Sequence, residues 1–333
     1  MTILVTGGLG YIGSHVVVEL LNLNHSVVVV DNLVNSDIGV KSRIEQIAGR
    51  EIVFCEVDLC DRAGLTWVFD NHKIDCVVHF AALKAVGESV EKPLKYYQNN
   101  IGGMINLLSV MHDHGVNKLV FSSSATVYGI PKTVPIKETS DIKAINPYGQ
   151  TKVVCEQIVQ DYAASNPNFG VINLRYFNPV GAHSSLLIGE NPKGIPNNLM
   201  PVVCNVAIGK QDKLKIFGHD YDTIDGTCVR DYVHVVDLAL GHVSALKWVM
   251  NNSGVEFVNL GTGKGATVME VVQTFEQVTG VKVPFEIVGR RAGDATEAVA
   301  STDKAKKLLA WQSSKGLADM CRDHLGYAKN ATN

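Results

Sequence analysis

The first 31 residues carry the pattern that most constrains the fold of this chain. An apolar, β-branched run from Thr2 to Thr6 passes directly into a turn rich in glycine, and a helical pattern follows from Ser14 to Leu23. A second apolar run, from Ser26 to Val30, ends at Asp31. The order strand, glycine turn, helix, strand is typical of parallel strands joined by a crossover helix.

The glycine turn and the acid after the second strand together indicate a dinucleotide site. Gly7, Gly10 and Gly13 allow a tight turn, a close approach of the backbone to a pyrophosphate, and close packing of helix on strand. The start of the helix then offers unpaired N–H groups to phosphates. Asp31 follows about 20 residues later, where a carboxylate can bind both hydroxyls of an adenosine ribose and repels a 2′-phosphate. Since no Arg or Lys follows before Lys41, we expect NAD and not NADP as the cofactor.

Strands and helices keep alternating through the first half of the chain, which predicts a doubly wound (Rossmann) α/β fold with a parallel sheet. From about Asn178 the pattern loosens into loops rich in Gly, Pro and Asn. We therefore expect an NAD-binding domain at 1–177, to which some later segments return, and a smaller substrate-binding lobe at 178–333. The further expected strands are Ile52–Val57, Cys76–Phe80, Leu119–Ser124 and Val171–Tyr176, and the further expected helices are Gly64–Asn71, Pro93–His114 and Pro147–Ser165.

Composition and leader pattern exclude several classes of protein. A net charge of −3 gives no case for binding nucleic acid, and no apolar stretch approaches the ~18 residues of a membrane span. The first expected strand begins at the second residue, with no basic or apolar leader before it, so we expect a cytoplasmic protein. Seven cysteines without a C-x-x-C pair and 11 scattered histidines without H-E-x-x-H spacing predict no metal site.

A tyrosine and a lysine four residues apart, Tyr148 and Lys152, carry the strongest chemical signal. On a helix they share a face, with Cβ atoms about 6 Å apart, and Asn146-Pro147 indicates the cap and first position of that helix. A tyrosine ionises near pH ~10 and acts as a base at neutral pH only beside a positive charge, which Lys152 can supply. Because Tyr-x-x-x-Lys is short and common, a surface pair is the alternative interpretation.

Residues at two other strand ends fit the same cleft. The run from His79 to Lys84 leaves a strand with small residues, so the backbone can approach a cofactor and Lys84 can meet its phosphates. The serines at 122–124 alone would read as a polar cap, but together with Tyr148 they make Ser124 a hydrogen-bond partner for a reacting oxygen. Asn99 could bond a ribose or hold the backbone near it, and the sequence leaves both options open.

Longer motifs extend the signal over the whole chain. They are Phe80–Ser89, Arg175–His183 and Gly194–Leu199, in addition to the glycine turn, Ser124 and the Tyr148–Lys152 pair. On these motifs the chain resembles the UDP-glucose 4-epimerases of the extended short-chain dehydrogenase/reductase family. The resemblance implies interconversion of UDP-glucose and UDP-galactose through a bound 4-keto sugar, with NAD⁺ as a recycled cofactor. It also implies that Tyr148 removes the 4-hydroxyl proton, that Lys152 lowers the Tyr148 pKa and holds the nicotinamide ribose, and that Ser124 helps carry the 4-oxygen.

The resemblance also implies two wider sets of site residues. The cofactor set contains Tyr148 and Lys152. It also contains Gly7, Gly10, Tyr11, Ile12, Gly13, Asp31, Asn32, Asn35, Asp58, Leu59, Phe80, Ala81, Lys84, Asn99, Ser122 and Tyr176. To Ser124 and Tyr148 the UDP-sugar set adds Phe177, Asn178, Asn197, Asn198, Leu199, Phe217, Arg230, Arg291, Asp294 and Ala298. The arginines would meet the diphosphate through their planar fork of donors, and Asp294 the uridine. Taken singly, these residues would read as surface charges, loop amides or core aromatics.

One position departs from the family pattern. Ala298 stands where some relatives carry a bulky tyrosine beside the sugar 2-position. A small residue enlarges the pocket, so our hypothesis is that UDP-N-acetylglucosamine (UDP-GlcNAc) and UDP-N-acetylgalactosamine (UDP-GalNAc) are also substrates. The alternative is that Ala298 lies on a shifted loop and a neighbour fills the space.

Three other functions stay open on the sequence alone. A sugar-nucleotide 4,6-dehydratase would need acids after Ser124, where this chain has Ala125 and Thr126. A decarboxylase acting on UDP-glucuronate would need a cation for the sugar carboxylate. A non-catalytic NAD-binding regulatory protein could dispense with the Tyr148–Lys152 pair, since fold does not imply activity.

The helices expected at Pro93–His114 and Pro147–Ser165 carry more apolar residues than one sheet face requires, among them Ile101, Leu108 and Val154. The family resemblance implies that two such helices pair across a homodimer. The alternative is that both faces are covered within one subunit.

Overall fold

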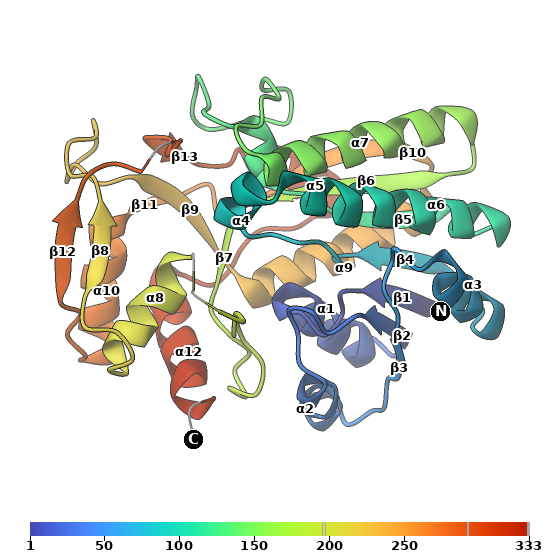
Figure 1. The fold of residues 1–333 in the computed structure, drawn as a ribbon, viewed down its shortest axis with the longest axis horizontal. Helices are drawn as coiled ribbons and strands as arrows, with labels where there is room; N and C mark the ends of the chain where they lie inside the picture. The colour runs from blue at the N-terminus through green and yellow to red at the C-terminus, as the bar shows by residue number, and fades with distance from the viewer. Residues whose placement is uncertain (195, 197, 292, 332–333) are drawn as a thin grey trace.

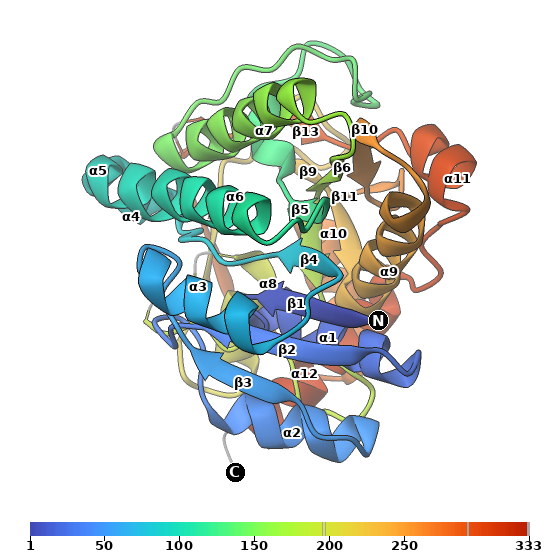
Figure 2. The same cartoon turned by 90° about the vertical axis from the view of Figure 1, so that its right-hand side faces the viewer.

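The computed structural model describes residues 1–194, 196, 198–291 and 293–331. A sheet of seven parallel strands dominates it, in the order β10-β6-β5-β4-β1-β2-β3 (Figure 2). The chain starts in the middle of this sheet, builds one half of it outward, and then crosses back to build the other half. The order therefore reverses between β1 and β4. In open sheets of this kind, ligands bind at such a reversal, outside the carboxyl ends of the strands.

The inner strands β1, β4, β5 and β6 are buried on both faces, as expected for a parallel sheet covered by helices on both sides, while the edge strand β3 is partly exposed. In β1, Ile3 and Val5 belong to one core and Leu4 to the other. The six strands predicted from the sequence are confirmed, each within two residues, while β10 was not predicted. The strands are β1 (Thr2–Thr6), β2 (Ser26–Asp31), β3 (Val53–Glu56), β4 (Cys76–His79), β5 (Lys118–Ser122), β6 (Gly170–Tyr176) and β10 (Gly254–Leu260).

Helices form a layer on each face of the main sheet (Figures 1 and 2). One layer holds α1 (Tyr11–Asn22), α2 (Gly39–Ala48) and α9 (Val235–Asn251), and the other holds α3 (Arg62–Asn71), α6 (Gly103–Asp113) and α7 (Pro147–Ser165). The late elements α9 and β10 complete the main sheet and its cover, with α11 (Asp303–Leu309) packed beside them. The domain boundary between 177 and 178 stays a prediction.

The predicted helix over Pro93–His114 is confirmed as an unbroken helical run from Pro93 to Asp113, but it is not α-helical throughout. After α4 (Val86–Glu91), the structure has α5 (Pro93–Tyr96), a π-helical turn η1 (Tyr97–Gly102), and then α6. The side chain of Asn100 in η1 is held by the backbone of Leu83, with Leu83 N donating to Oδ1 at 2.8 Å and Nδ2 donating to Leu83 O at 3.0 Å. The wider turn thus has partners outside the helix, which periodicity cannot reveal.

The smaller lobe lies at the left in Figure 1 and has a core of its own. Its elements are a mixed sheet of β7 (Asn178–Val180), β9 (Val229–His234), β11 (Gly265–Thr267) and β13 (Glu297–Ala298), a parallel pair β8 (Leu214–Phe217) and β12 (Phe285–Val288), and the helices α8 (Leu199–Ala207), α10 (Val268–Thr279) and α12 (Leu317–Asn330). Over the residues that the structure describes, no helix is both long and apolar enough to span a membrane.

Candidate active site

The turn between β1 and α1 is a cradle with no room for side chains. Gly7 has φ +68°, and a Cβ atom there would lie 2.8 Å from the backbone nitrogen of Ala81. Gly10 is the N-cap of α1, and no side chain caps this helix. The first N–H groups of α1, from Tyr11 onward, therefore face the open side of the turn without a side-chain acceptor, which suits a pyrophosphate.

Asp31, predicted to bind the adenosine ribose, and four other residues of the cofactor set lie at or after the carboxyl ends of β2 and β3. Asp31 is buried, and its two oxygens accept from Leu9 N at 3.1 Å, Leu33 N at 3.0 Å and Ser36 Oγ at 2.7 Å. Asn32 Nδ2 donates to Asp58 Oδ2 at 2.8 Å. Ser36 was not identified from the sequence, because a serine in a loop carries no pattern of its own. The remaining two members of this group differ in exposure, Asn35 being exposed and Leu59 buried.

The loop after β4 brings Lys84 to the same cradle. Its Nζ lies 6.0 Å from the centre of the Tyr11 ring and 3.4 Å from Glu190 Oε1. Asn99 donates only to the side chain of Asn100, at 2.9 Å, and it is Asn100 that holds the backbone of this loop. Asn100, and not Asn99, therefore supports the backbone of this loop. A hydrogen bond between Asn99 and a ribose stays a prediction.

Helix α7 presents three side chains, at four-residue spacing, to three consecutive serines at the end of β5. The predicted cap is confirmed, since Asn146 Oδ1 accepts from Gly149 N at 2.8 Å. Ser124 lies near enough to Tyr148 to lower its pKa, and Lys152 Nζ donates to Ser122 O at 2.8 Å. One turn further along α7, Glu156 Oε1 accepts from Ser123 Oγ at 2.6 Å.

Tyr148 and Lys152 are not a surface pair, because only 7% and 4% of them are exposed. Burial raises the pKa of Tyr148, with a smaller contribution from Tyr176, and Ser124 only partly opposes it. Burial also lowers the pKa of Lys152 to about 8. The ammonium of Lys152 is directed to the Ser122 carbonyl and lies 6.0 Å from the centre of the Tyr148 ring. In the protein alone, burial therefore outweighs the expected lowering of the Tyr148 pKa by Lys152.

A buried ion pair behind the serines was missed by the sequence reasoning. Arg175 from β6 binds Glu156 through two bonds, Nε to Oε1 at 2.9 Å and Nη2 to Oε2 at 2.7 Å. Its Nη1 donates to the hydroxyl of Tyr128 at 3.1 Å, and that hydroxyl donates to Asn259 Oδ1 at 2.7 Å. The spacing of Glu156, eight residues after Tyr148 on one helix, was the available signal.

On the side of the smaller lobe, four predicted residues from three distant segments come together. Arg291 donates to both carboxylate oxygens of Asp294, at 3.0 and 3.2 Å, and Arg230 Nη2 lies 3.5 Å from Asp294 Oδ1. The Arg291 guanidinium also lies 5.4 Å from the centre of the Phe217 ring. A single carboxylate thus serves two cations here, and both guanidinium groups can take a diphosphate in addition.

The other predicted substrate residues lie on several elements. Ala298 pairs with Arg230 across β13 and β9, so it lies on a strand and not on a shifted loop. It packs against a cluster that includes Val127 and Phe177, just beyond Ser124. Asn178 and Asn198 are exposed, Leu199 begins α8, and Asn197 lies outside the described residues.

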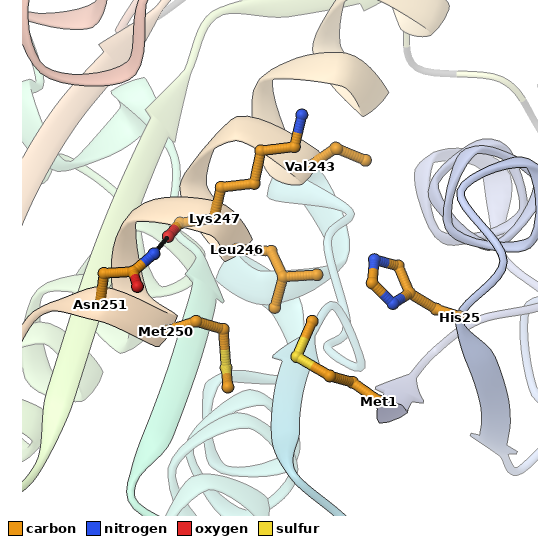
Figure 3. A pocket seen from close by; sticks show the side chains of 7 residues that line it. All are labelled: Met1, His25, Val243, Leu246, Lys247, Met250 and Asn251. Atoms are coloured by element: carbon orange, nitrogen blue, oxygen red, sulfur yellow. Dashed lines mark hydrogen bonds between the residues drawn. The ribbon is translucent and has the colours of Figure 1, made fainter.

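A hollow at the opposite edge of the main sheet contains none of the predicted residues (Figure 3). Met1 and His25 precede β1 and β2, so this hollow lies at the amino ends of the strands. Its lining consists of Met1, His25, Val243, Leu246, Lys247, Met250 and Asn251. The candidate site is therefore the carboxyl edge, where the glycine turn and the serines lie. Within the described parts of the chain, no group of three or more His, Cys, Asp or Glu side chains is placed to hold a metal ion.

Known proteins resemble this chain over nearly its full length. The model of the GDP-mannose 4,6 dehydratase family matches residues 4–324. A UDP-glucose 4-epimerase from Bacillus subtilis is 54% identical over 323 residues, which cover 97% of this chain and 95% of that protein. The solved UDP-glucose 4-epimerase from Stenotrophomonas maltophila, with bound NAD and formylated UDP-arabinopyranose, is 50% identical with a TM-score of 0.98 and coverage of 100% and 99%. The UDP-Glc/GlcNAc 4-epimerase from Campylobacter jejuni is 39% identical with a TM-score of 0.87 and coverage of 99% of each chain.

Proposed function

The chain belongs to the family that the GDP-mannose 4,6 dehydratase model describes and, within it, to the UDP-glucose 4-epimerases, and we propose the roles of its residues from that premise. It is an NAD-dependent isomerase that interconverts UDP-glucose and UDP-galactose. The observation that carries the proposed roles is the burial of Tyr148 and Lys152 against Ser122 and Ser124 at the carboxyl end of β5.

For the cofactor we propose three protein contacts. The uncapped start of α1 takes the pyrophosphate, Asp31 takes the adenosine ribose, and Lys152 takes the nicotinamide ribose. The tight fit of Gly7 supports the first contact, because a side chain there would push the turn away from the backbone of Ala81. Bound NAD⁺ would supply reversible hydride transfer at C4 of the sugar and a positive charge beside the phenol of Tyr148.

The protein moves and holds the proton of the sugar 4-hydroxyl. We propose that the phenol oxygen of Tyr148 takes this proton while Ser124 keeps its bond to the 4-oxygen, and that Tyr148 returns the proton at the end. Lys152, whose pKa is about 8, is charged at neutral pH and favours the phenolate. Burial raises the Tyr148 pKa, so positive charge beside the phenol oxygen would favour the phenolate.

The nucleotide, and not the sugar, is the anchor. A planar 4-keto sugar must turn about its link to the diphosphate so that its other face meets the returning hydride. We propose that Arg230 and Arg291 hold the diphosphate and that Asp294 holds the uridine side, which leaves the sugar few fixed contacts. The clustering of these residues on one side of the cleft supports this division.

N-acetylated UDP-sugars are proposed as additional substrates. The strand position of Ala298, beside the cluster that contains Phe177, supports a roomy pocket, and the Campylobacter jejuni relative acts on both sugar types by its name. An Ala298→Tyr variant should lose turnover of UDP-GalNAc and keep turnover of UDP-galactose. Glu297→Tyr, at the exposed neighbouring strand position, is the matched control and should keep both. Full turnover of UDP-GalNAc by Ala298→Tyr would dismiss the idea.

The reaction itself is tested with purified protein and no added NAD⁺. UDP-galactose and UDP-GalNAc are supplied separately, and the 4-epimers are resolved by anion-exchange chromatography. Conversion of UDP-galactose is expected, since the cofactor is recycled within the site. No conversion, even after NAD⁺ is supplied, would favour the decarboxylase, dehydratase or non-catalytic alternatives.

A cytoplasmic homodimer is the proposed form of the protein. Val90, Leu94 and Ile105 on α4, α5 and α6 are 63%, 81% and 49% exposed, which supports a partner over these helices. Light scattering after size exclusion should give twice the subunit mass, and Leu94→Glu should shift the protein to monomer. A wild-type monomer at micromolar concentration would contradict the proposal.

A further inference from the structure

Glu190 is a buried carboxylate that binds one residue from each side of the cleft. Its side chain is 3% exposed. Oε1 accepts from Lys84 Nζ at 3.4 Å, on the proposed cofactor side, and from Asn198 Nδ2 at 2.7 Å, on the proposed nucleotide-sugar side. Oε2 is buried and has no hydrogen-bond partner among the described residues.

The backbone beside Glu190 is held by two contacts that involve neither Lys84 nor Asn198. Gly189 forms a β-bridge with Ala182, closing a short turn. Gly189 also lies flush against Tyr327 in α12, where a Cβ atom would come within 2.5 Å of the ring. Because this backbone is fixed, a movement of Lys84 or Asn198 must change the bonds of the carboxylate.

Lys84 stands between two anionic positions. One is Glu190, and the other is the place of the pyrophosphate at the start of α1, where Tyr11 is the first residue. The carboxylate also acts on Tyr11, since the Tyr11 pKa is raised mainly by burial and next by the charge of Glu190. Because an ammonium has three donors on a flexible stem, Lys84 can turn from Glu190 toward a phosphate.

The side chain of Asn198 does not form the hydrogen bond that is usual at its position. It is the N-cap of α8, and asparagine is among the best capping residues, yet its side chain does not cap the helix. The amide binds Glu190 instead. This contact ties Asn198, which the family resemblance places in the UDP-sugar set, to a buried carboxylate.

A buried carboxylate needs compensation for its charge, and here two bonds to one oxygen provide it. When one donor shifts away, the remaining bond carries more of that compensation and becomes stronger. We propose, on the basis of the proposed function, that Glu190 is a positioning residue that couples retention of NAD⁺ to binding of the UDP moiety. When the pyrophosphate of NAD⁺ attracts Lys84, the bond between Glu190 and Asn198 becomes stronger and orders the start of α8. Because coupling between two sites is reciprocal, UDP bound near α8 strengthens the binding of NAD⁺.

The test uses the holoenzyme and measures cofactor exchange, not turnover. Bound NAD⁺ is exchanged for fluorescent etheno-NAD⁺ with and without UDP at a concentration shown by titration to saturate each variant. In the wild type, UDP should slow the exchange about tenfold, which lies within the usual range of coupling between sites. In Glu190→Gln, which keeps the shape and removes the charge, UDP should slow it less than twofold.

A double-mutant cycle assigns the effect to the contact between Glu190 and Asn198. Asn198→Ala leaves the buried carboxylate in place and should also reduce the slowing to less than twofold, and the double variant should add nothing further. Lys92→Met, which removes an exposed partner of Glu88, is the control and should keep the tenfold slowing. The proposal would be overturned if UDP slowed NAD⁺ exchange equally in the wild type and in both single variants. It would also be overturned if the effects of the two substitutions multiplied in the double variant. Failure of the wild type to epimerise UDP-galactose would instead contradict the proposed function.

Discussion

The two sides of the candidate site differ in how their charged groups are satisfied. On the side of β5 and α7, the charges of Glu156 and Arg175 are about 95% buried and bound to each other twice. On the side of the smaller lobe, Arg230 and Arg291 share the carboxylate of Asp294, and 56% of the Arg291 side chain is exposed. The first arrangement is complete before any ligand arrives, whereas the second has donors left for a diphosphate. A fixed catalytic side and an adaptable anchor suit a reaction in which the sugar must turn between two hydride transfers.

The largest expected effect falls on the fixed side. Tyr148→Phe removes the proposed base while the ring still fills its buried place, so kcat with UDP-galactose should fall about 10²–10⁴-fold. The measurement is a progress curve with separation of the two 4-epimers. Bound NAD⁺, determined after denaturation, should be unchanged. A loss of less than fivefold would remove Tyr148 from its role.

Variants of the buried ion pair test whether the stability of the catalytic side depends on each charge having its partner. Glu156→Ala leaves the Arg175 guanidinium buried without its partner and should lower the free energy of unfolding by about 3–5 kcal/mol. Replacing both residues at once, as Glu156→Leu with Arg175→Met, should cost far less, since no charge is then stranded. Urea unfolding of the three proteins measures both values. Equal losses in the single and double variants would show that packing, and not pairing, stabilises this side.

On the adaptable side, the expected loss is one of affinity. Arg291→Met removes a charge-assisted bond to the diphosphate, worth about 1.5–3 kcal/mol, so KM for UDP-galactose should rise about 10–100-fold while kcat changes little. Arg290→Met is the matched control, because Arg290 instead binds Asp220 and stacks on Tyr221. Steady-state kinetics on both variants separates KM from kcat. A fall in kcat with unchanged KM would show that Arg291 acts in catalysis and not in binding of the diphosphate.

The smallest expected effect is a pH dependence at a histidine of the smaller lobe. His324 in α12 accepts from Gly181 N at 3.2 Å, and burial lowers its pKa to about 4 from the ordinary 6.5. The unfolded chain therefore binds the proton first, so stability is present above pH ~6.5 and is lost as the pH falls toward 4. His324→Asn keeps an acceptor for Gly181 and does not titrate, so its Tm should fall less between pH 7 and pH 5. Parallel Tm curves for the two proteins would contradict this.

Features encoded within a few neighbouring residues were predictable from the sequence. The glycine turn between β1 and α1, and the Asn146 cap that starts α7, depend on local backbone chemistry and appear in the structure as expected. The predicted strands also formed, because a run of β-branched apolar residues has few alternatives inside a parallel sheet. The four-residue spacing of Tyr148 and Lys152 placed both on one face of a helix, which the sequence alone could determine.

Contacts between distant segments were decided only by the tertiary structure. Glu156 meets Arg175 from another strand, Asn100 holds the loop after β4 within a π-helical turn, and Glu190 contacts Lys84 across 106 residues of chain. Burial depends on the same packing, which is why the pKa of Tyr148 rises although a lysine stands one turn away. Sequence spacing specifies which residues share a face, but the distance to a partner on another element, and the water excluded around it, exist only once the elements have packed.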